Sequence, residues 1–153
     1  MYRLISFSVF LFMTRIDCRS QTVEYLHDQI PVMDSLTTAL DNDPGYRVYN
    51  MQSGQAGDSV CNLGSYQGIV YYNNKLHEIS KLKIHPTFRK EIITIYCMKD
   101  SILKISIDKT SYYRIGKHFY DRSGEEVINP EMITKLDDFG SILKLAFVNF
   151  SNN

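Results

Sequence analysis

Histidines are the side chains best suited to acid–base or metal chemistry, and the sequence has four: His27, His77, His85 and His118. His77 and His85 are eight residues apart, which on an unbroken strand places them on one face about 26 Å from each other. They cannot share one metal ion at that distance. Neither an HExxH motif nor a His-x-His pair occurs. The histidine spacing therefore predicts no metal site.

Other catalytic patterns are also missing from the sequence. Asp137 and Asp138 are adjacent on a predicted helix, where neighbouring side chains diverge by about 100°, so they make a poor carboxylate pair. No serine lies in a GxSxG motif, and the loop at 52–58 (QSGQAGD) has neither a Gly-Lys-Ser ending nor GxGxxG spacing. We predict no catalytic residue and no cofactor. A small hydrolase with His77, His85 or His118 as its base remains an alternative.

The first twenty residues predict an export signal. Arg3 is a short basic start, and an apolar run of ten residues at 4–13 (LISFSVFLFM) follows it. Ten residues are too few for a membrane span, which needs about 20. Cys18 and Ser20 suit the cleavage positions, so the mature chain is expected to begin at Gln21 and to lie outside the cytoplasm, secreted or periplasmic. A buried N-terminal strand of a cytosolic protein is the alternative, and Asp17 before Cys18 disfavours a lipoprotein.

Two cysteines remain after the predicted cleavage, Cys61 and Cys97. In an oxidising compartment they could form a disulfide, which would add roughly 4 kcal/mol of stability according to the chain-entropy relation. A buried, unpaired cysteine in the core is the alternative. The sequence has no CxxC motif and no Cys/His zinc spacing.

Composition predicts one globular domain over 21–153. The chain has 153 residues, 44% of them hydrophobic, which is enough for a core. Seventeen Lys and Arg balance seventeen Asp and Glu, and no basic tract occurs. Nucleic-acid binders need clustered basic residues, so we expect no nucleic-acid partner. We also expect no membrane span in the mature chain.

The spacing of apolar residues divides this domain into helical and strand segments. A first helix is predicted at 22–41, with Pro31 suited to its first position and Met33, Leu36 and Leu40 on one face. From Gln67 onward the period becomes two, with polar turns between runs. The predicted strands are 46–51, then the hairpins 69–72 with 75–84, 92–98 with 102–108, and 112–120 with 125–128.

The three hairpins also repeat at a fixed interval. Tyr72, Tyr96 and Tyr120 are each 24 residues apart, and so are Ile79, Leu103 and Val127 on the predicted return strands. Leu103 alternates with polar neighbours and is expected to face the core. Such short units must share one sheet to bury their apolar faces. The three tyrosines occupy equivalent positions in this repeat and are expected to project from the same face.

Helical spacing returns at the C-terminus. Asn129 can cap a helix, Pro130 suits its first turn and Glu131 suits its positive end. An apolar stripe follows at spacings of four and three: Met132, Leu136, Phe139, Leu143, Ala146 and Phe150. We expect this helix to cover one face of the sheet, although Gly140 weakens it by about 1 kcal/mol and a strand at 142–150 is an alternative. The fold class is α+β.

Three short strings carry a resemblance: 69–76 (IVYYNNKL), 93–100 (ITIYCMKD) and 118–124 (HFYDRSG). They resemble the hairpin repeats of small exported proteins of Gram-negative bacteria, which have an aromatic pair, a polar turn and a Lys-Leu return strand. The resemblance covers roughly 67–128. It implies an α+β fold and an envelope location, and it implies no catalytic residue and no named ligand.

The aromatic residues suggest what the domain does. Adjacent tyrosines on a strand point to opposite faces, so one member of each pair lies away from the core. Tyrosines on an open sheet face suit recognition, because they offer large contact area at small entropy cost. We therefore predict a binding module of the inhibitor, immunity or envelope-ligand type that uses Tyr72, Tyr96 and Tyr120, with an unknown protein or envelope ligand as partner. A structural part of an envelope assembly is the alternative, and the tyrosines could instead only stabilise the sheet.

Overall fold

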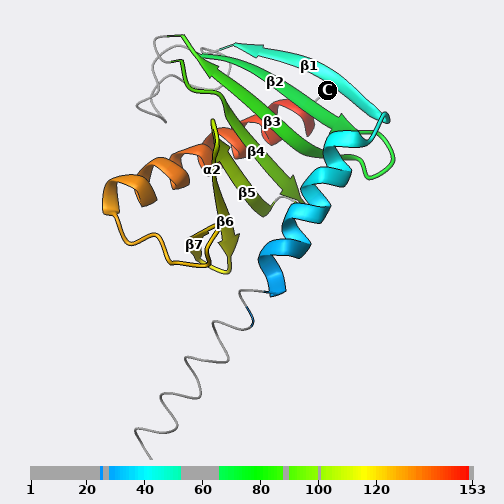
Figure 1. The fold of residues 1–153 in the computed structure, drawn as a ribbon. Helices are drawn as coiled ribbons and strands as arrows, with labels where there is room; N and C mark the ends of the chain where they lie inside the picture. The colour runs from blue at the N-terminus through cyan, green and yellow to red at the C-terminus, as the bar shows by residue number, and fades with distance from the viewer. Residues whose placement is uncertain (1–24, 26–27, 53–65, 88–89, 100, 152–153) are drawn as a thin grey trace, which may run out of the picture.

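The fold is known from a computed structural model, which describes residues 25, 28–52, 66–87, 90–99 and 101–151. Its centre is one seven-stranded antiparallel sheet, with a helix at the N-terminal side and another at the C-terminal end (Figure 1). The predicted α+β class, with consecutive hairpins and a C-terminal helix on one face, is confirmed. The predicted signal segment at 1–20 lies outside the described residues.

The seven strands lie in the sheet in chain order, so each pairs with the next along the chain. They are β1 (Tyr46–Gln52), β2 (Tyr66–Asn73), β3 (Glu78–Pro86), β4 (Ile93–Met98), β5 (Ser101–Ile107), β6 (Thr110–Ile115) and β7 (His118–Asp121). The predicted polar turn at Asn73 and Asn74 joins β2 to β3. In this turn, the Asn73 Oδ1 accepts hydrogen bonds from the backbone N–H groups of Lys75 and Leu76.

The predicted strand boundaries of the third hairpin are wrong. The run 112–120 is not one strand, because a turn at Gly116 (φ 63°) separates β6 from β7. Glycine adopts this positive φ without a steric penalty. The predicted return strand at 125–128 is reduced to one bridge between Tyr120 and Glu126. Tyr120 therefore lies on a return strand whereas Tyr96 lies on an outgoing one, and the 24-residue interval does not mark equivalent positions.

The C-terminal helix α2 (Pro130–Ser151) confirms the helical prediction for 142–150 over the strand alternative. The Asn129 side chain caps it by accepting hydrogen bonds from the backbone N–H groups of Glu131 and Met132. Gly140 lies inside the helix and does not break it. A Cβ atom there would come within 3.2 Å of Ile102 on β5, so glycine lets the helix approach the sheet closely.

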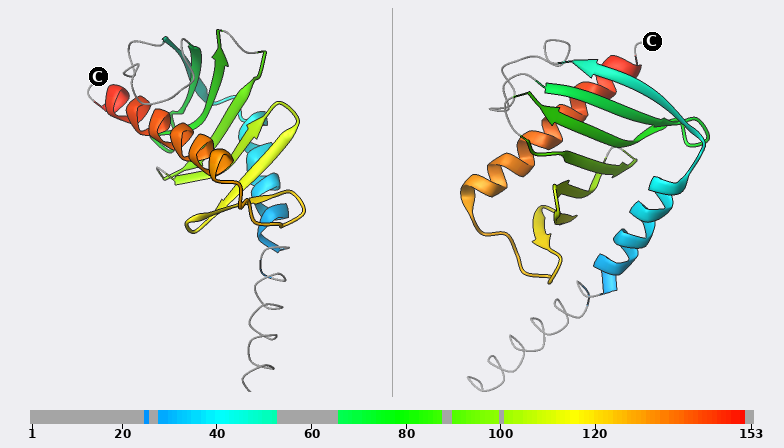
Figure 2. Two further views of the ribbon diagram at one scale, coloured as in Figure 1. Left: turned by 90° about the vertical axis from the view of Figure 1, so that its left-hand side faces the viewer. Right: turned by 45° about the horizontal axis from the view of Figure 1, so that its top comes forward.

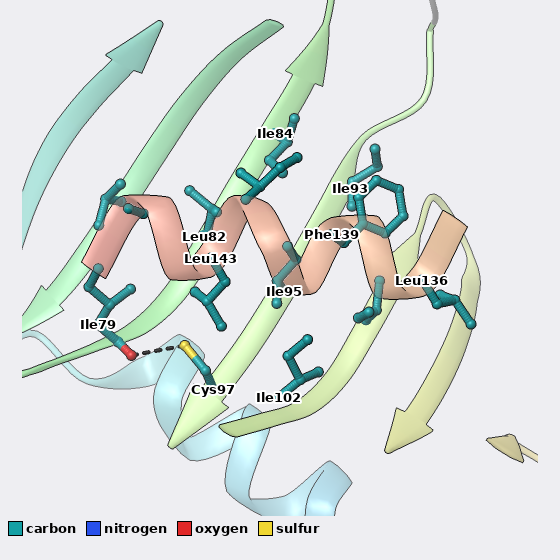
Figure 3. Close-up of a cluster of buried hydrophobic side chains, with 14 of the residues drawn as sticks. Ile79, Leu82, Ile84, Ile93, Ile95, Cys97, Ile102, Leu136, Phe139 and Leu143 are labelled. Carbon is teal, nitrogen blue, oxygen red and sulfur yellow. Dashed lines mark hydrogen bonds between the residues drawn. The ribbon is translucent and has the colours of Figure 1, made fainter. Parts of the chain in front are cut away.

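The main core lies between α2 and one face of the sheet (Figure 3). Most of the predicted stripe is buried there: Leu136, Phe139, Leu143 and Ala146 are at most 2% exposed. The sheet contributes aliphatic side chains from its central strands, with Val70, Leu82, Ile84, Ile93, Ile95 and Ile105 fully buried. We call this side of the sheet the α2 face.

The N-terminal helix (residues 28–42) packs on the opposite side of the sheet, which we call the N-helix face (Figure 2). Pro31 is not its first residue, because helical residues 28–30 precede it. Leu36, predicted to share one face with Met33 and Leu40, is 38% exposed, whereas Ile30, Thr37 and Leu40 are buried. No helix in the described part of the chain is both long and apolar enough to cross a membrane.

Candidate functional site

The three tyrosines of the predicted binding patch do not share a face. Tyr96 pairs with Lys81, which pairs with Tyr71, so Tyr71 lies on the face of Tyr96 and its neighbour Tyr72 lies on the other. Tyr72 packs against the core on the α2 face. Tyr120 lies with Tyr96 on the N-helix face. The expected common face is therefore wrong for Tyr72, because the 24-residue interval ignores the different turn positions of the hairpins.

A row of tyrosines and lysines crosses the N-helix face at one level. The register places neighbouring strands' residues beside one another in the order Tyr71, Lys81, Tyr96, Lys104, Tyr113 and Tyr120. The lysine ammonium groups lie against the rings: Lys81 Nζ is 4.2 Å from the centroid of Tyr71, and Lys104 Nζ is 5.4 Å from that of Tyr113. We call this set the tyrosine–lysine row.

Two aspartates of the N-terminal helix bind the row through matching triads. Asp41 accepts hydrogen bonds from Lys81 Nζ and from the Tyr96 hydroxyl, each at 2.8 Å. Asp34 accepts them from Lys104 Nζ at 2.6 Å and from the Tyr113 hydroxyl at 2.8 Å. In each triad the lysine and the tyrosine are cross-strand neighbours. The helix is therefore held to the sheet at two equivalent points.

The spacing of the aspartates explains why both triads can form. Asp34 and Asp41 are seven residues apart, which is about 10.5 Å along a helix and close to two full turns. Their lysines lie on β3 and β5, two strands apart, which is about 9.6 Å across a sheet. A helix that crosses the strands thus meets both lysines with one face.

The charge state of the triads suits anchoring rather than proton transfer. Burial, the hydrogen bond to Asp34 and its negative charge raise the pKa of Tyr113 to about 12. Burial and Asp41 likewise raise the pKa of Tyr96. Burial by itself would raise the pKa of Asp34, but hydrogen bonds from Lys104 and Tyr113 and the nearby cations lower it below its ordinary value. At neutral pH the tyrosines keep their protons and Asp34 stays ionised.

The described histidines lie on different parts of the sheet. His77 lies in the β2–β3 turn with a φ of 54°, His85 lies near the end of β3, and His118 on β7 contacts Glu126 through Nδ1 at 2.7 Å. His27 lies outside the described residues. Within the described residues, no three His, Cys, Asp or Glu side chains are close enough to hold a metal ion.

Cys97 is buried on the α2 face, and its Sγ donates to the carbonyl oxygen of Ile79 at 2.9 Å (Figure 3). Its predicted disulfide partner, Cys61, lies outside the described residues, so the pairing stays a prediction.

A groove opens beside the core where β5 and β6 separate. The pairing of β5 with β6 ends at Lys104 and Tyr113. Beyond Tyr113, β6 pairs only with β7. At the same place β5 has a bulge: Tyr96 is opposite Lys104 but Cys97 is opposite Ile102, so Leu103 is an extra residue. Leu103 was predicted to be buried, and the bulge leaves it partly exposed.

The groove has a volume of about 720 Å³ and lies between the separated strands and α2. We call it the β5–α2 groove. Its walls combine aliphatic, hydroxyl and charged side chains: Ser101, Ile102, Leu103, Arg114, Gly116, Asp137, Gly140, Ser141, Leu143 and Lys144. None of these residues was singled out by sequence patterns as a binding residue.

The cations of the groove differ from the lysines of the triads in their partners. Within the described part of the chain, Arg114 and Lys144 form no salt bridge, whereas Lys81, Lys104 and Lys135 each do. The guanidinium of Arg114 instead lies 5.5 Å from the centroid of the Phe119 ring. This cation–π contact places the guanidinium beside the ring, and its N–H donors make no salt bridge within the described residues.

The chain matches no protein-family model, no curated protein and no solved structure. Within the described residues, the chain is an α+β protein with two helices packed on a seven-stranded meander and with a groove between the sheet and α2.

Proposed function

We propose that the protein is an extracytoplasmic binding module without a catalytic step, and that its ligand occupies the β5–α2 groove. The observation that carries the proposal is the volume of about 720 Å³ between α2 and the separated strands β5 and β6. Pockets that hold small molecules have volumes of about 300–1,000 Å³ and combine apolar walls with a few polar groups. The volume of the groove lies in this range, and its lining combines three aliphatic residues with five polar or charged ones.

The makeup of the groove favours binding over catalysis. Its described lining contains no histidine and no cysteine. Arg114 keeps its proton in proteins and cannot act as a base. Tyr96 and Tyr113, whose pKa values are raised, lie on the N-helix face, where their hydroxyl groups donate to aspartates of the N-terminal helix. These placements give little support to the hydrolase alternative.

The tyrosine–lysine row offers little accessible surface at its centre for binding a partner. Tyr96 is only 9% exposed and Tyr113 is fully buried, because the N-terminal helix covers them. We therefore assign the ligand to the opposite side of the sheet. The extracytoplasmic location rests on the apolar run at 4–13 alone.

The binding proposal can be tested with an uncharged fluorescent probe, N-phenyl-1-naphthylamine, whose emission rises in apolar sites. Ser101 is exposed at the groove, so Ser101→Trp fills the groove with little effect on the core. Thr110→Trp is the control, since Thr110 is also exposed but begins β6 away from the groove. We expect saturable binding by the parent and the control, and about tenfold weaker binding by Ser101→Trp, equivalent to about 1.4 kcal/mol. Equal binding by all three proteins, or none by the parent, contradicts the proposal.

Export has a separate test. N-terminal sequencing of the protein from its native source should begin at Gln21. A cytosolic protein that retains Met1 would refute the predicted signal peptide.

A further inference from the structure

We infer that the ligand of the β5–α2 groove is an amphiphile with one carboxylate and a medium-length hydrocarbon chain. This inference rests on the proposed binding function and adds the chemical class of the ligand. It follows from the charge of the groove, from its apolar wall and from the kind of cation it contains.

The charge of the groove fits a single negative charge. Arg114 and Lys144 supply two positive charges and Asp137 one negative charge, which leaves a net charge of +1 among the lining residues. Neither cation is neutralised by a salt bridge within the described residues. A monoanion would balance the site, whereas Asp137 would repel the additional charge of a phosphate monoester.

The apolar wall fits a hydrocarbon chain. Three aliphatic residues line the groove: Leu103 is partly exposed, and Ile102 and Leu143 are 5% and 2% exposed. Gly140 packs directly against Ile102, so the helix backbone borders this wall on one side. Covering the exposed aliphatic surface of Leu103 is favourable by roughly 25 cal/mol for each Å² removed from water.

The kind of cation favours a carboxylate. The planar guanidinium of Arg114 presents paired N–H donors that match the two oxygens of a carboxylate, and such charge-assisted bonds are about twice as strong as neutral ones. The hydroxyl groups of Ser101 and Ser141 also line the groove and can donate to the same oxygens. Lys144 adds a second, more flexible positive charge.

The test compares three ligands that share a ten-carbon chain and differ in the head group: decanoate, decanol and decyltrimethylammonium. The two ionic ligands are titrated below their critical micelle concentrations and decanol below its solubility limit, all at pH 8, by calorimetry and by displacement of N-phenyl-1-naphthylamine. We expect decanoate to bind at least about tenfold more tightly than decanol, a difference of about 1.4 kcal/mol. Decyltrimethylammonium should bind most weakly, because its positive charge is repelled by Arg114 and Lys144.

Variants assign the preference to the two cations. Arg114→Gln and Lys144→Gln should each weaken decanoate binding about tenfold and leave the uncharged probe unaffected. Arg114→Lys keeps the positive charge and should lose less decanoate affinity than Arg114→Gln. Because both variants lack the guanidinium that contacts Phe119, their comparison separates the effect of the charge from that of the contact. Lys117→Gln removes an exposed positive charge that does not line the groove, and it should bind decanoate like the parent.

The possible outcomes separate this inference from the proposed function. Equal affinity for decanoate and decanol, or tighter binding of decyltrimethylammonium, refutes the carboxylate preference while probe binding still supports a ligand groove. Displacement of the probe by none of the three ligands also refutes the inference. Absence of probe binding by the parent refutes the proposed function itself.

Discussion

The two helices are attached to opposite faces of one sheet by different kinds of contact. Helix α2 packs on the sheet through fully buried residues such as Phe139 and Leu136. The N-terminal helix is attached by the ion pairs and hydrogen bonds of Asp34 and Asp41 with the tyrosine–lysine row, beside a few buried apolar residues. Apolar packing depends on buried area, whereas ion pairs depend on pH and salt. The two faces should therefore respond differently to substitution and to solution conditions.

The largest effect is expected on the α2 face. Phe139→Ala removes a fully buried ring from the core and should lower the free energy of unfolding by about 3–5 kcal/mol. Chemical denaturation at pH 7 measures the change, and it should be nearly the same at low and high salt. A loss below about 1 kcal/mol would mean that α2 does not form the main core.

A smaller effect is expected on the N-helix face. Asp34→Asn removes the charge that pairs with Lys104, whose side chain is only 15% exposed. Hydrogen bonds to charged groups contribute about 1.5–3 kcal/mol when well buried. Since the side chain of Asp34 is 28% exposed and thus partly screened, we expect a loss of about 1–2 kcal/mol.

Asp28→Asn provides the matched control, because Asp28 is exposed on the same helix. It should change the free energy of unfolding by less than about 0.5 kcal/mol. The difference between the two variants should shrink in high salt. Equal effects of the two substitutions would show that the Asp34 triad does not stabilise the helix.

These two faces also differ in how well the sequence predicted them. The α2 stripe was predictable because helical periodicity and the Asn129 cap are local signals. The triads were missed, although one signal was present: Asp34 and Asp41 are seven residues apart and therefore lie on one helix face. The lysine and the tyrosine of each triad are brought together by strand register across the sheet, which local patterns do not determine.

The groove was missed for a different reason. It depends on the separation of β6 from β5 and on the bulge that makes Leu103 an extra residue. Both are irregularities in pairing between strands, and strict alternation in the sequence predicts their absence. The same alternation misplaced Leu103 in the core, and the equal spacing of tyrosines misplaced Tyr72 beside Tyr96.

Leu103 tests the bulge directly. Leu103→Ala should cost about 1 kcal/mol, below the 2–5 kcal/mol typical of a buried leucine, because a partly exposed side chain at an open groove leaves no closed cavity. Denaturant titration of this variant beside Phe139→Ala measures both on one scale. A cost above about 2 kcal/mol would place Leu103 in the core and contradict a bulge that leaves it partly exposed.

The smallest effect concerns pH. The folded pKa of Asp34 lies below its ordinary value of 3.8, so its contribution to stability is complete above about pH 4 and is lost as the pH falls through the lowered pKa. The free-energy difference between the parent and Asp34→Asn should therefore narrow below pH 4. A difference that widens in acid would contradict the assignment.

Tyr113 acts in the opposite pH range. Its pKa is raised from 10 to about 12, so its contribution to stability is complete below pH 10 and is lost toward pH 12.

The central claim is that the β5–α2 groove is where this protein binds its ligand. Amide chemical shifts of the isotopically labelled protein, followed during titration with decanoate, test it most directly. We expect saturable shifts that concentrate on Leu103, Arg114 and Gly140, with the shifts of the tyrosine–lysine row unchanged. Shifts that concentrate on the N-helix face, around Tyr96 and Tyr113, would contradict it.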